Sequence, residues 1–226
     1  MATPDAPYTL LDIGPSQGLP DWARVAGSLY PKVAGVAVKA SEGATGAGST
    51  VETFARNAAG VVAAGLPLSA YHFLSPFSAG RDQAAHFLAT IDGCGHTLCP
   101  MVDVERSVGA AGRIPTLDTL LDFLDAVSTA LDVVPLIYTA AWVATPMGLG
   151  AHPELKQYPL WVPSYTQSDP PPCAPWGAWD DPAGNVLAWQ YTSKGSVPGI
   201  AQPCDVSRFK ALPSWVCLSV PAEPST

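Results

Sequence analysis

The sequence predicts an α/β barrel of eight strands whose last strands lack covering helices. Its 226 residues fit a single barrel domain. Short apolar runs alternate with longer segments of helical period, which is the pattern of strand–helix units around a parallel sheet. The helical pattern stops after Tyr165. An open doubly wound sheet is the alternative, but Gly14–Gly18 lacks the G-x-G-x-x-G spacing of a nucleotide-binding turn.

Each expected strand is a short apolar run. In chain order the strands are Thr9–Ile13, Val33–Ala40, Leu66–Phe73, Pro100–Glu105, Val134–Thr139, Leu160–Tyr165, Val186–Tyr191 and Cys204–Val206. The clearest helix is expected at Thr116–Leu131, which carries leucine and valine along one stripe and aspartate largely opposite. A similar stripe runs from Val51 to Val62, with Thr50 as the expected N-cap and Gly65 as the stop. Further helices are expected at Asp21–Leu29, at Ala79–Thr90 and, more weakly, after Thr139.

Composition and charge exclude several classes of partner. The chain is 48% hydrophobic and only 13% charged, so it has enough apolar material for a large core. Its 19 acidic and 11 basic residues give a net charge of -8, which argues against nucleic acid as a partner. No apolar stretch reaches the roughly 18 residues of a membrane-spanning helix, so we expect no membrane insertion. We expect a monomer.

The five cysteines show no C-x-x-C spacing, so neither a zinc site nor any other metal or cofactor is expected. A disulfide between Cys94 and Cys99, or between Cys204 and Cys217, is sterically conceivable. Buried free thiols are the equal alternative. At the N-terminus, residues 1–8 lack a basic region followed by an apolar one, so no secretory signal is recognised.

Four acidic residues occupy the strand positions where barrel enzymes carry their chemistry. Functional groups of a parallel barrel collect at the C-terminal ends of the strands. Asp12 closes the first expected strand, Asp103 and Glu105 close the fourth, and Asp205 lies in the eighth, which neighbours the first when the barrel closes. We therefore expect these four carboxyls to face one cavity.

The pair Asp103 and Glu105 is the sharpest local feature. Residues two apart on a strand point the same way, with Cα atoms about 6.5 to 7 Å apart. Met101 shares their face, and the intervening valines face the helices. Two like charges in one cavity favour retention of a proton near neutral pH, which would supply a general acid beside an anion. The alternatives for D-V-E alone are a solvated strand end or a pair of metal ligands.

Aromatic residues also gather near the predicted strand ends. These residues are Tyr71, Tyr138, Trp161, Tyr165, Trp189 and Tyr191. Acids and aromatic rings at a barrel mouth suit a sugar chain, whose apolar ring faces stack on aromatic side chains. Core packing is the alternative for each ring taken alone. His72 lies between Tyr71 and Phe73 and therefore points to the other side of its strand, where a structural role is expected.

Ordered motifs along the chain resemble those of the glycoside hydrolase family 25 lysozymes, also called Chalaropsis-type muramidases. The first are D-I-G-P-S-Q-G from Asp12, K-A-S-E-G from Lys39, and A-G-L-P-L-S-A-Y-H-F ending at Phe73. P-M-V-D-V-E ends at Glu105, and I-Y-T ends at Thr139. The last are L-W-V-P-S-Y ending at Tyr165, W-Q-Y-T ending at Thr192, and C-D-V-S-R-F ending at Phe209. Ser16 departs from the family, which usually has Trp there, and this puts substrate affinity or register in doubt.

The resemblance implies a TIM-like (β/α)5(β)3 barrel that cleaves the β-1,4 bond from N-acetylmuramic acid to N-acetylglucosamine in peptidoglycan. It implies that Glu105 is the general acid and Asp103 the partner anion, flanked by Asp12 and Asp205. Substrate-assisted retention and inversion by water both stay open. Substrate contacts are implied for matching residues, namely Glu42, Tyr71, Tyr138, Trp161, Tyr165 and Gln190.

We expect residues 1–212 to form the catalytic domain and residues 213–226, which contain several prolines, to form a tail or linker stump. A phage lysin, made in the host cytoplasm and acting on the wall, is the favoured setting, and a secreted autolysin is the nearest variant. The alternatives in function are an inactive barrel that binds wall glycan without cutting it, and an enzyme acting on chitin or another N-acetylhexosamine polymer.

Overall fold

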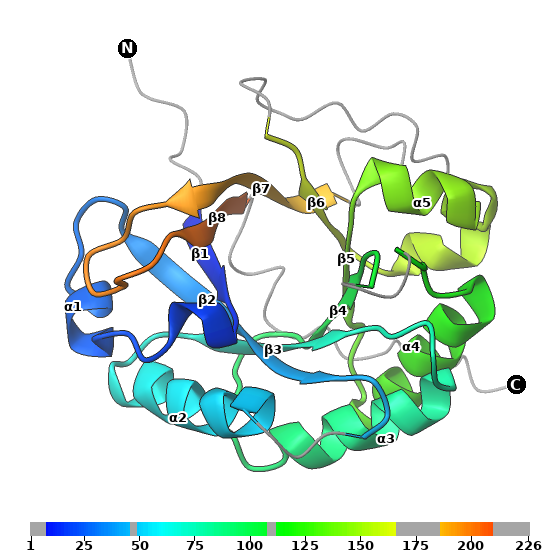
Figure 1. Ribbon diagram of the computed structural model, residues 1–226, viewed down its shortest axis with the longest axis horizontal. Helices are drawn as coiled ribbons and strands as arrows, with labels where there is room; N and C mark the ends of the chain where they lie inside the picture. The colour runs from blue at the N-terminus through cyan, green and yellow to red at the C-terminus, as the bar shows by residue number, and fades with distance from the viewer. Residues whose placement is uncertain (1–7, 46–48, 108–111, 166–185, 210–226) are drawn as a thin grey trace, which may run out of the picture.

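The predicted barrel is confirmed in a computed structural model that describes residues 8–45, 49–107, 112–165 and 186–209. Eight strands close into one barrel in sequence order (Figure 1). The strands are β1 (Tyr8–Ile13), β2 (Val33–Glu42), β3 (Leu68–Phe73), β4 (Met101–Val104), β5 (Leu136–Thr139), β6 (Leu160–Pro163), β7 (Val186–Gly195) and β8 (Cys204–Phe209). The expected tail, Cys173 and Cys217 lie outside the described residues.

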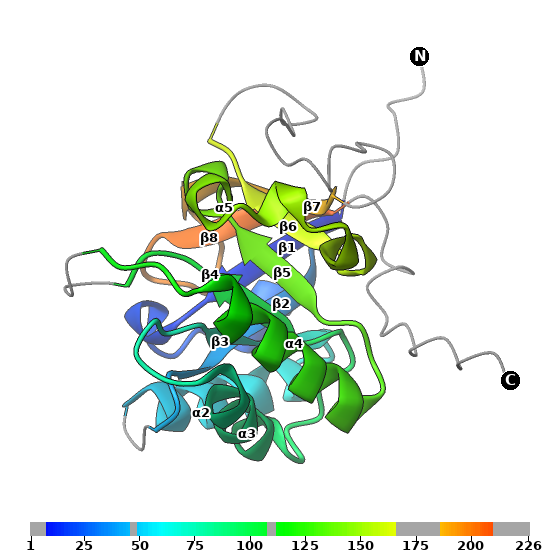
Figure 2. The ribbon, with the colours of Figure 1, turned by 90° about the vertical axis from the view of Figure 1, so that its right-hand side faces the viewer.

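Helices cover the outside of the strands for which the sequence predicted a following helix. They are α1 (Trp22–Ala26), α2 (Ser49–Ala63), α3 (Gly80–Ile91), α4 (Leu117–Leu131) and α5 (Ala141–Met147), with 3-10 turns η1 (Pro15–Gln17), η2 (Leu149–Ala151) and η3 (Pro153–Gln157). Figure 2 shows α2, α3 and α4 packed side by side along one side of the barrel. In the described parts of the chain, no helix has the length and apolarity needed to span a membrane.

Two details of the expected helices change. The helix α2 already includes Ser49, so the prediction of Thr50 as its N-cap is wrong. The helix α1 ends at Ala26 rather than Leu29, because the chain turns at Gly27, although Asp21 caps its start by accepting a hydrogen bond from the Arg24 amide at 3.1 Å. The cap of α4 is Thr116, whose hydroxyl accepts from the Thr119 amide at 3.2 Å.

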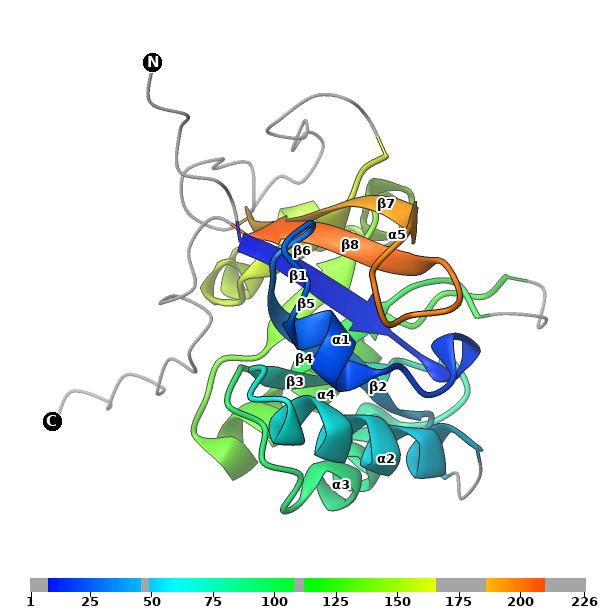
Figure 3. The same ribbon diagram turned by 90° about the vertical axis from the view of Figure 1, so that its left-hand side faces the viewer.

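The last strand runs against the others. Each neighbouring pair from β1 to β7 is parallel, whereas β8 is antiparallel to both β7 and β1. Residues 196–203 join β7 to β8, and a parallel crossover needs about a dozen residues or more, so only a hairpin fits. As Figure 3 shows, the start of β8 therefore lies at the barrel end where β1 finishes.

The barrel has two apolar cores, separated by its wall. Outward-facing residues such as Leu11, Val38 and Val102 pack against the helices. A second cluster fills the interior and contains Leu10, Ala37, Met101, Leu136, Trp161, Ala188 and Phe209. Alternation along each strand produces this division, since successive side chains point to opposite faces. The inner core closes the barrel beneath the strand ends, so any cavity at those ends has an apolar floor.

Two of the cysteines are free thiols. Cys94 is free and its Sγ lies 3.6 Å from Nδ1 of His96, so no disulfide joins it to Cys99. Cys204 is also free, and burial raises the pKa of its thiol to about 12.

Candidate active site

A cavity of about 310 Å³ opens at the C-terminal end of the parallel strands. All four acids singled out by the sequence line it: Asp12 from β1, Asp103 from β4, Glu105 directly after β4, and Asp205 from β8. Residues far apart in the chain are thus brought to one surface by closure of the barrel.

The strand geometry explains how each acid reaches the cavity. On β4, Met101 and Asp103 line the cavity, while Val102 and Val104 belong to the core beneath the helices. Asp12 and Asp205 are direct partners in the antiparallel register of β1 and β8. Asp205 is the second residue of β8, so it reaches this end of the barrel only because β8 is antiparallel.

Gln190 on β7 connects one of the acids to two tyrosines. Its Nε2 lies 3.2 Å from each carboxyl oxygen of Asp12, and its Oε1 accepts hydrogen bonds from Tyr138 Oη at 3.1 Å and Tyr165 Oη at 2.8 Å. These contacts fix the orientation of the amide. Together with Tyr71, they place four of the six residues implied as substrate contacts at the cavity wall.

Burial raises the pKa of every acid in the cavity, and repulsion from a neighbouring acid adds to this rise for Asp12, Asp103 and Glu105. Burial is the largest cause for each acid. The second cause is charge repulsion, which comes from Asp205 for Asp12 and Glu105, and from Glu105 for Asp103. The pKa of Asp205 rises to about 6 because of its burial. Such a cluster titrates as a unit and retains protons at a pH where isolated carboxyls have lost them. The cavity can therefore hold a general acid beside an anion.

One buried carboxylate oxygen in this cavity is unsatisfied. Asp103 is buried, and its Oδ1 has no hydrogen-bond partner among the described residues. Leaving such an atom unpaired costs about 1–3 kcal/mol. A ligand that donates a hydrogen bond to Oδ1 would recover this loss. Within the described ranges, no group of three or more His, Cys, Asp or Glu side chains could hold a metal ion.

Lys39 is a residue of the site that the sequence reasoning did not single out. It lines the cavity, its ammonium lies 4.6 Å from the centre of the Phe73 ring, and its charge lowers the pKa of Asp103 and of Glu105 against the effect of burial. A lysine within the apolar run of β2 was the available signal, because burying a charge needs a partner. Gln17 and Ser16 from η1 also line the cavity and were not predicted as contacts.

Two implied substrate contacts are not at the cavity wall. Trp161 has 0% of its surface exposed and donates a hydrogen bond to Ser207 Oγ at 2.9 Å, so the prediction that it contacts substrate is corrected: it is part of the inner core. Trp161 pairs with Tyr138 across β5 and β6, but the stagger of a barrel puts paired residues at different depths. Glu42 is exposed and forms an ion pair with Lys39 at 2.7 Å, so it contacts a residue of the cavity wall without lining the cavity itself.

A bulge in β2 makes that ion pair possible. The register with β3 shifts between Lys39 and Ser41, so Lys39 is opposite Tyr71 and Ser41 is opposite His72. The extra residue reverses the alternation, as bulges do. Lys39 and Glu42 therefore lie on one face although they are three residues apart, and Ser41 is turned to the outer face.

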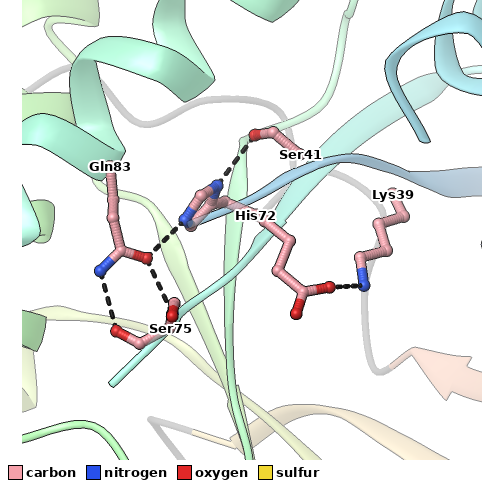
Figure 4. A network of polar contacts seen from close by, with 6 residues as sticks. Lys39, Ser41, His72, Ser75 and Gln83 are labelled. Atoms are coloured by element: carbon pink, nitrogen blue, oxygen red, sulfur yellow. Dashed lines mark hydrogen bonds and ion pairs between the residues drawn. The ribbon is translucent and has the colours of Figure 1, made fainter. Parts of the chain in front are cut away.

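His72 occupies that outer face, as predicted, within a satisfied network (Figure 4). Its Nδ1 lies 2.8 Å from Ser41 Oγ, and its Nε2 lies 3.0 Å from Gln83 Oε1. The Gln83 amide donates to the Ser75 and Ser78 carbonyls at 2.9 Å and accepts from the Ser75 amide at 2.7 Å. This fixes Oε1 as the acceptor, so Nε2 of His72 carries a proton. Burial lowers the pKa of His72 to about 4.

An α/β barrel that holds a cluster of carboxyls at the C-terminal ends of its strands has the architecture of a glycoside hydrolase. Comparison with known families specifies the class further. The model of the glycosyl hydrolases family 25 matches residues 11–200, and the chain belongs to this family.

Relatives and solved structures agree with this assignment. An autolytic lysozyme of Clostridium acetobutylicum is 29% identical over 201 residues, which are 88% of this chain and 55% of the relative. The chain spans about half the length of the curated relatives it matches. A bacterial lysozyme from Streptomyces coelicolor shares the fold with a TM-score of 0.76, 21% identity, and coverage of 94% of this chain and 97% of the other. A muramidase from Acremonium alcalophilum matches with a TM-score of 0.70 and 26% identity over 92% of this chain and 95% of the other.

Proposed function

We propose that this chain is a muramidase, which hydrolyses peptidoglycan at the β-1,4 bond between N-acetylmuramic acid and N-acetylglucosamine. The observation that carries the proposal is the convergence of Asp12, Asp103, Glu105 and Asp205 on one open cavity. A barrel that only binds glycan needs no cluster of proton-retaining acids. The similarity to an autolytic lysozyme and to a muramidase supports peptidoglycan as the substrate.

Glu105 is the proposed general acid, which protonates the leaving glycosidic oxygen. It lies directly after β4 and is half-buried, so it can reach a bound sugar, and its raised pKa keeps it protonated at higher pH than an exposed glutamate. Asp103 is the proposed partner anion: burial and Glu105 raise its pKa, but Lys39 opposes this rise, and its unpaired Oδ1 is available to accept a hydrogen bond from the substrate. In this proposal Asp12 and Asp205 repel further negative charge and so help Glu105 to retain its proton.

The tyrosines are proposed to bind the sugar. Tyr165 is 61% exposed, so its ring face is available to stack on a sugar ring, while its hydroxyl is held by Gln190. Tyr71 and Tyr138 have pKa values raised first by burial and then by Asp12, so both hydroxyls stay protonated and can donate hydrogen bonds. We propose the bacterial wall as the place of action, either for a phage lysin or for a secreted autolysin.

The direct test is to digest purified peptidoglycan and to identify the sugar at each new reducing end by mass spectrometry. Wild type should release fragments ending in N-acetylmuramic acid, and Glu105→Gln should slow this by about 10²- to 10⁴-fold. Glu52→Gln is the matched control, because it removes an exposed carboxyl on α2, outside the cavity.

Three results would contradict the proposal. Wall binding without release of fragments would identify a glycan-binding barrel. New ends in N-acetylglucosamine, or cleavage of chitin in preference to peptidoglycan, would change the substrate. Undiminished lysis by Glu105→Gln would remove Glu105 as the acid.

A further inference from the structure

Two arginines stack on exposed aromatic rings on either side of the strand that carries Asp103 and Glu105. Both arginines belong to the connection between β4 and α4. The guanidinium of Arg106 lies 5.5 Å from the ring centre of Trp142, which follows β5, and that of Arg113 lies 5.8 Å from the ring centre of Phe77, which follows β3. In Figure 3, the chain leaving β4 and the chain returning to α4 project beyond the barrel on the same side as η1.

These arginines are held in place by their own connection. Arg106 donates a hydrogen bond from Nη1 to the Gly112 carbonyl at 3.1 Å, and the Ser107 amide donates to the Arg113 carbonyl at 2.8 Å. Arg106 also directly follows the proposed general acid. The two stacks therefore have defined positions next to the catalytic cavity, one toward β3 and one toward β5.

Within the described part of the chain, no carboxylate pairs with either guanidinium. Among the described residues, Arg81 pairs with Asp125 at 3.1 Å and Lys39 pairs with Glu42 at 2.7 Å, but Arg106 and Arg113 have no acidic partner within 4 Å. Both side chains are exposed, and so are the rings beneath them, Phe77 at 55% and Trp142 at 52%. In a chain of net charge -8, two cations at the same end of the barrel as an acidic cavity, with no acidic partner among the described residues, suit an anionic ligand.

We propose that the two arginine–aromatic stacks, Arg106–Trp142 and Arg113–Phe77, bind carboxylates of the short peptides that branch from the glycan strand. The inference rests on the proposed function and specifies its substrate as peptide-bearing rather than bare glycan. Because the four cavity acids repel the anionic peptides of the substrate, binding needs compensating positive charge beside the cavity. A guanidinium held over a ring presents its N–H groups edge-on to a carboxylate, which it binds in a bidentate manner.

The test compares Arg106→Gln/Arg113→Gln with wild type on two substrates from the same wall, from which phosphate-containing polymers have been removed. One substrate keeps its peptides, and the other has been stripped of them with an amidase. On peptide-bearing strands the double variant should raise KM about 3- to 10-fold at low salt, with kcat unchanged. On stripped strands, its KM should equal that of wild type.

The matched control is Arg56→Gln, which removes an exposed charge from α2, away from the cavity; it should leave KM unchanged on both substrates. Equal thermal unfolding temperatures would show that the double variant is folded. Equal increases in KM on both substrates would overturn the proposal in favour of direct glycan contact. The absence of an increase in KM on either substrate would also overturn it. A third substrate, the same wall with its phosphate polymers retained, is assayed in parallel, and an increase in KM on that substrate alone would overturn the proposal in favour of phosphate. Failure of the proposed function is distinct, since wild type would then cleave neither substrate.

Discussion

Two buried polar clusters lie on opposite sides of the barrel wall, and they differ in how well their hydrogen bonds are satisfied. On the outer face, both ring nitrogens of His72 and both amide atoms of Gln83 have partners. On the inner face, four carboxyls share one cavity and Asp103 Oδ1 has no described partner. The difference separates structure from function: a satisfied cluster stabilises the fold, whereas an unsatisfied one has bonding capacity left for a ligand.

The two clusters also respond to pH in opposite directions. The pKa of His72 falls from its ordinary value of 6.5 to about 4, so the stability that its neutral form contributes is complete above pH 6.5 and is lost as pH falls toward 4. The cavity acids have raised pKa values, so folding favours their protonated forms. For Asp205, stability is therefore lost as pH rises from the ordinary aspartate pKa of 3.8 through its raised pKa of about 6.

The largest expected effect is on turnover. Asp103→Asn keeps the shape of the side chain and removes the partner anion, so kcat/KM should fall by about 10²-fold or more while the free energy of unfolding stays equal or rises. Hydrolysis of labelled peptidoglycan and chemical denaturation measure the two quantities. A fall in the free energy of unfolding together with the fall in kcat/KM would contradict the contrast between the two clusters, because it would make Asp103 a structural residue.

The next effect is on stability alone. Gln83→Leu removes the acceptor of His72 and leaves its partners buried, so it should cost about 2–4 kcal/mol of unfolding free energy. Turnover of the folded fraction at 25 °C should stay within about twofold of wild type. Gln157→Leu is the matched control at an exposed position and should change stability by less than about 0.5 kcal/mol. A selective loss of kcat in Gln83→Leu would show that the outer network takes part in catalysis.

A smaller gain in stability is expected from relief of repulsion in the cavity. Asp205→Asn should raise the free energy of unfolding by about 1 kcal/mol at pH above the pKa of Asp205, since the side chain is partly open to solvent and the repulsion is screened. At pH below about 4 the gain should vanish, because the carboxyl is protonated in both states. A gain that does not depend on pH would point to packing instead of charge.

Removal of Lys39 should give the smallest effect, a displacement of the pH profile. The lysine lowers the pKa of Asp103 and of Glu105, so Lys39→Met should move both limbs of the activity profile to higher pH by about half a unit to one unit. Lys39→Arg keeps the charge and should leave the limbs in place. An unchanged profile in Lys39→Met would show that the ammonium does not act on the pair.

Much of the inner cluster was predictable from the sequence, because strand period alone puts Asp103 and Glu105 on one face and Val102 on the other. Three features were not. The reversed direction of β8, which brings Asp205 to the cavity where it was expected, was not predicted, and the pairing of Lys39 with Glu42 depends on a bulge that no residue type marks. The depth of Trp161 depends on barrel stagger, which a strand's own period does not contain.

The central claim is that the four cavity carboxyls retain protons at a pH where exposed carboxyls are ionised. Its most direct test is a carbon-13 NMR titration of the aspartate and glutamate carboxyls. Asp12→Asn, Asp103→Asn, Glu105→Gln and Asp205→Asn would assign the four signals. The predicted result is four midpoints displaced upward, that of Asp205 to about 6, with a cavity carboxyl still protonated near pH 6. Ionisation of all four below about pH 4.5, as for exposed carboxyls, would contradict it.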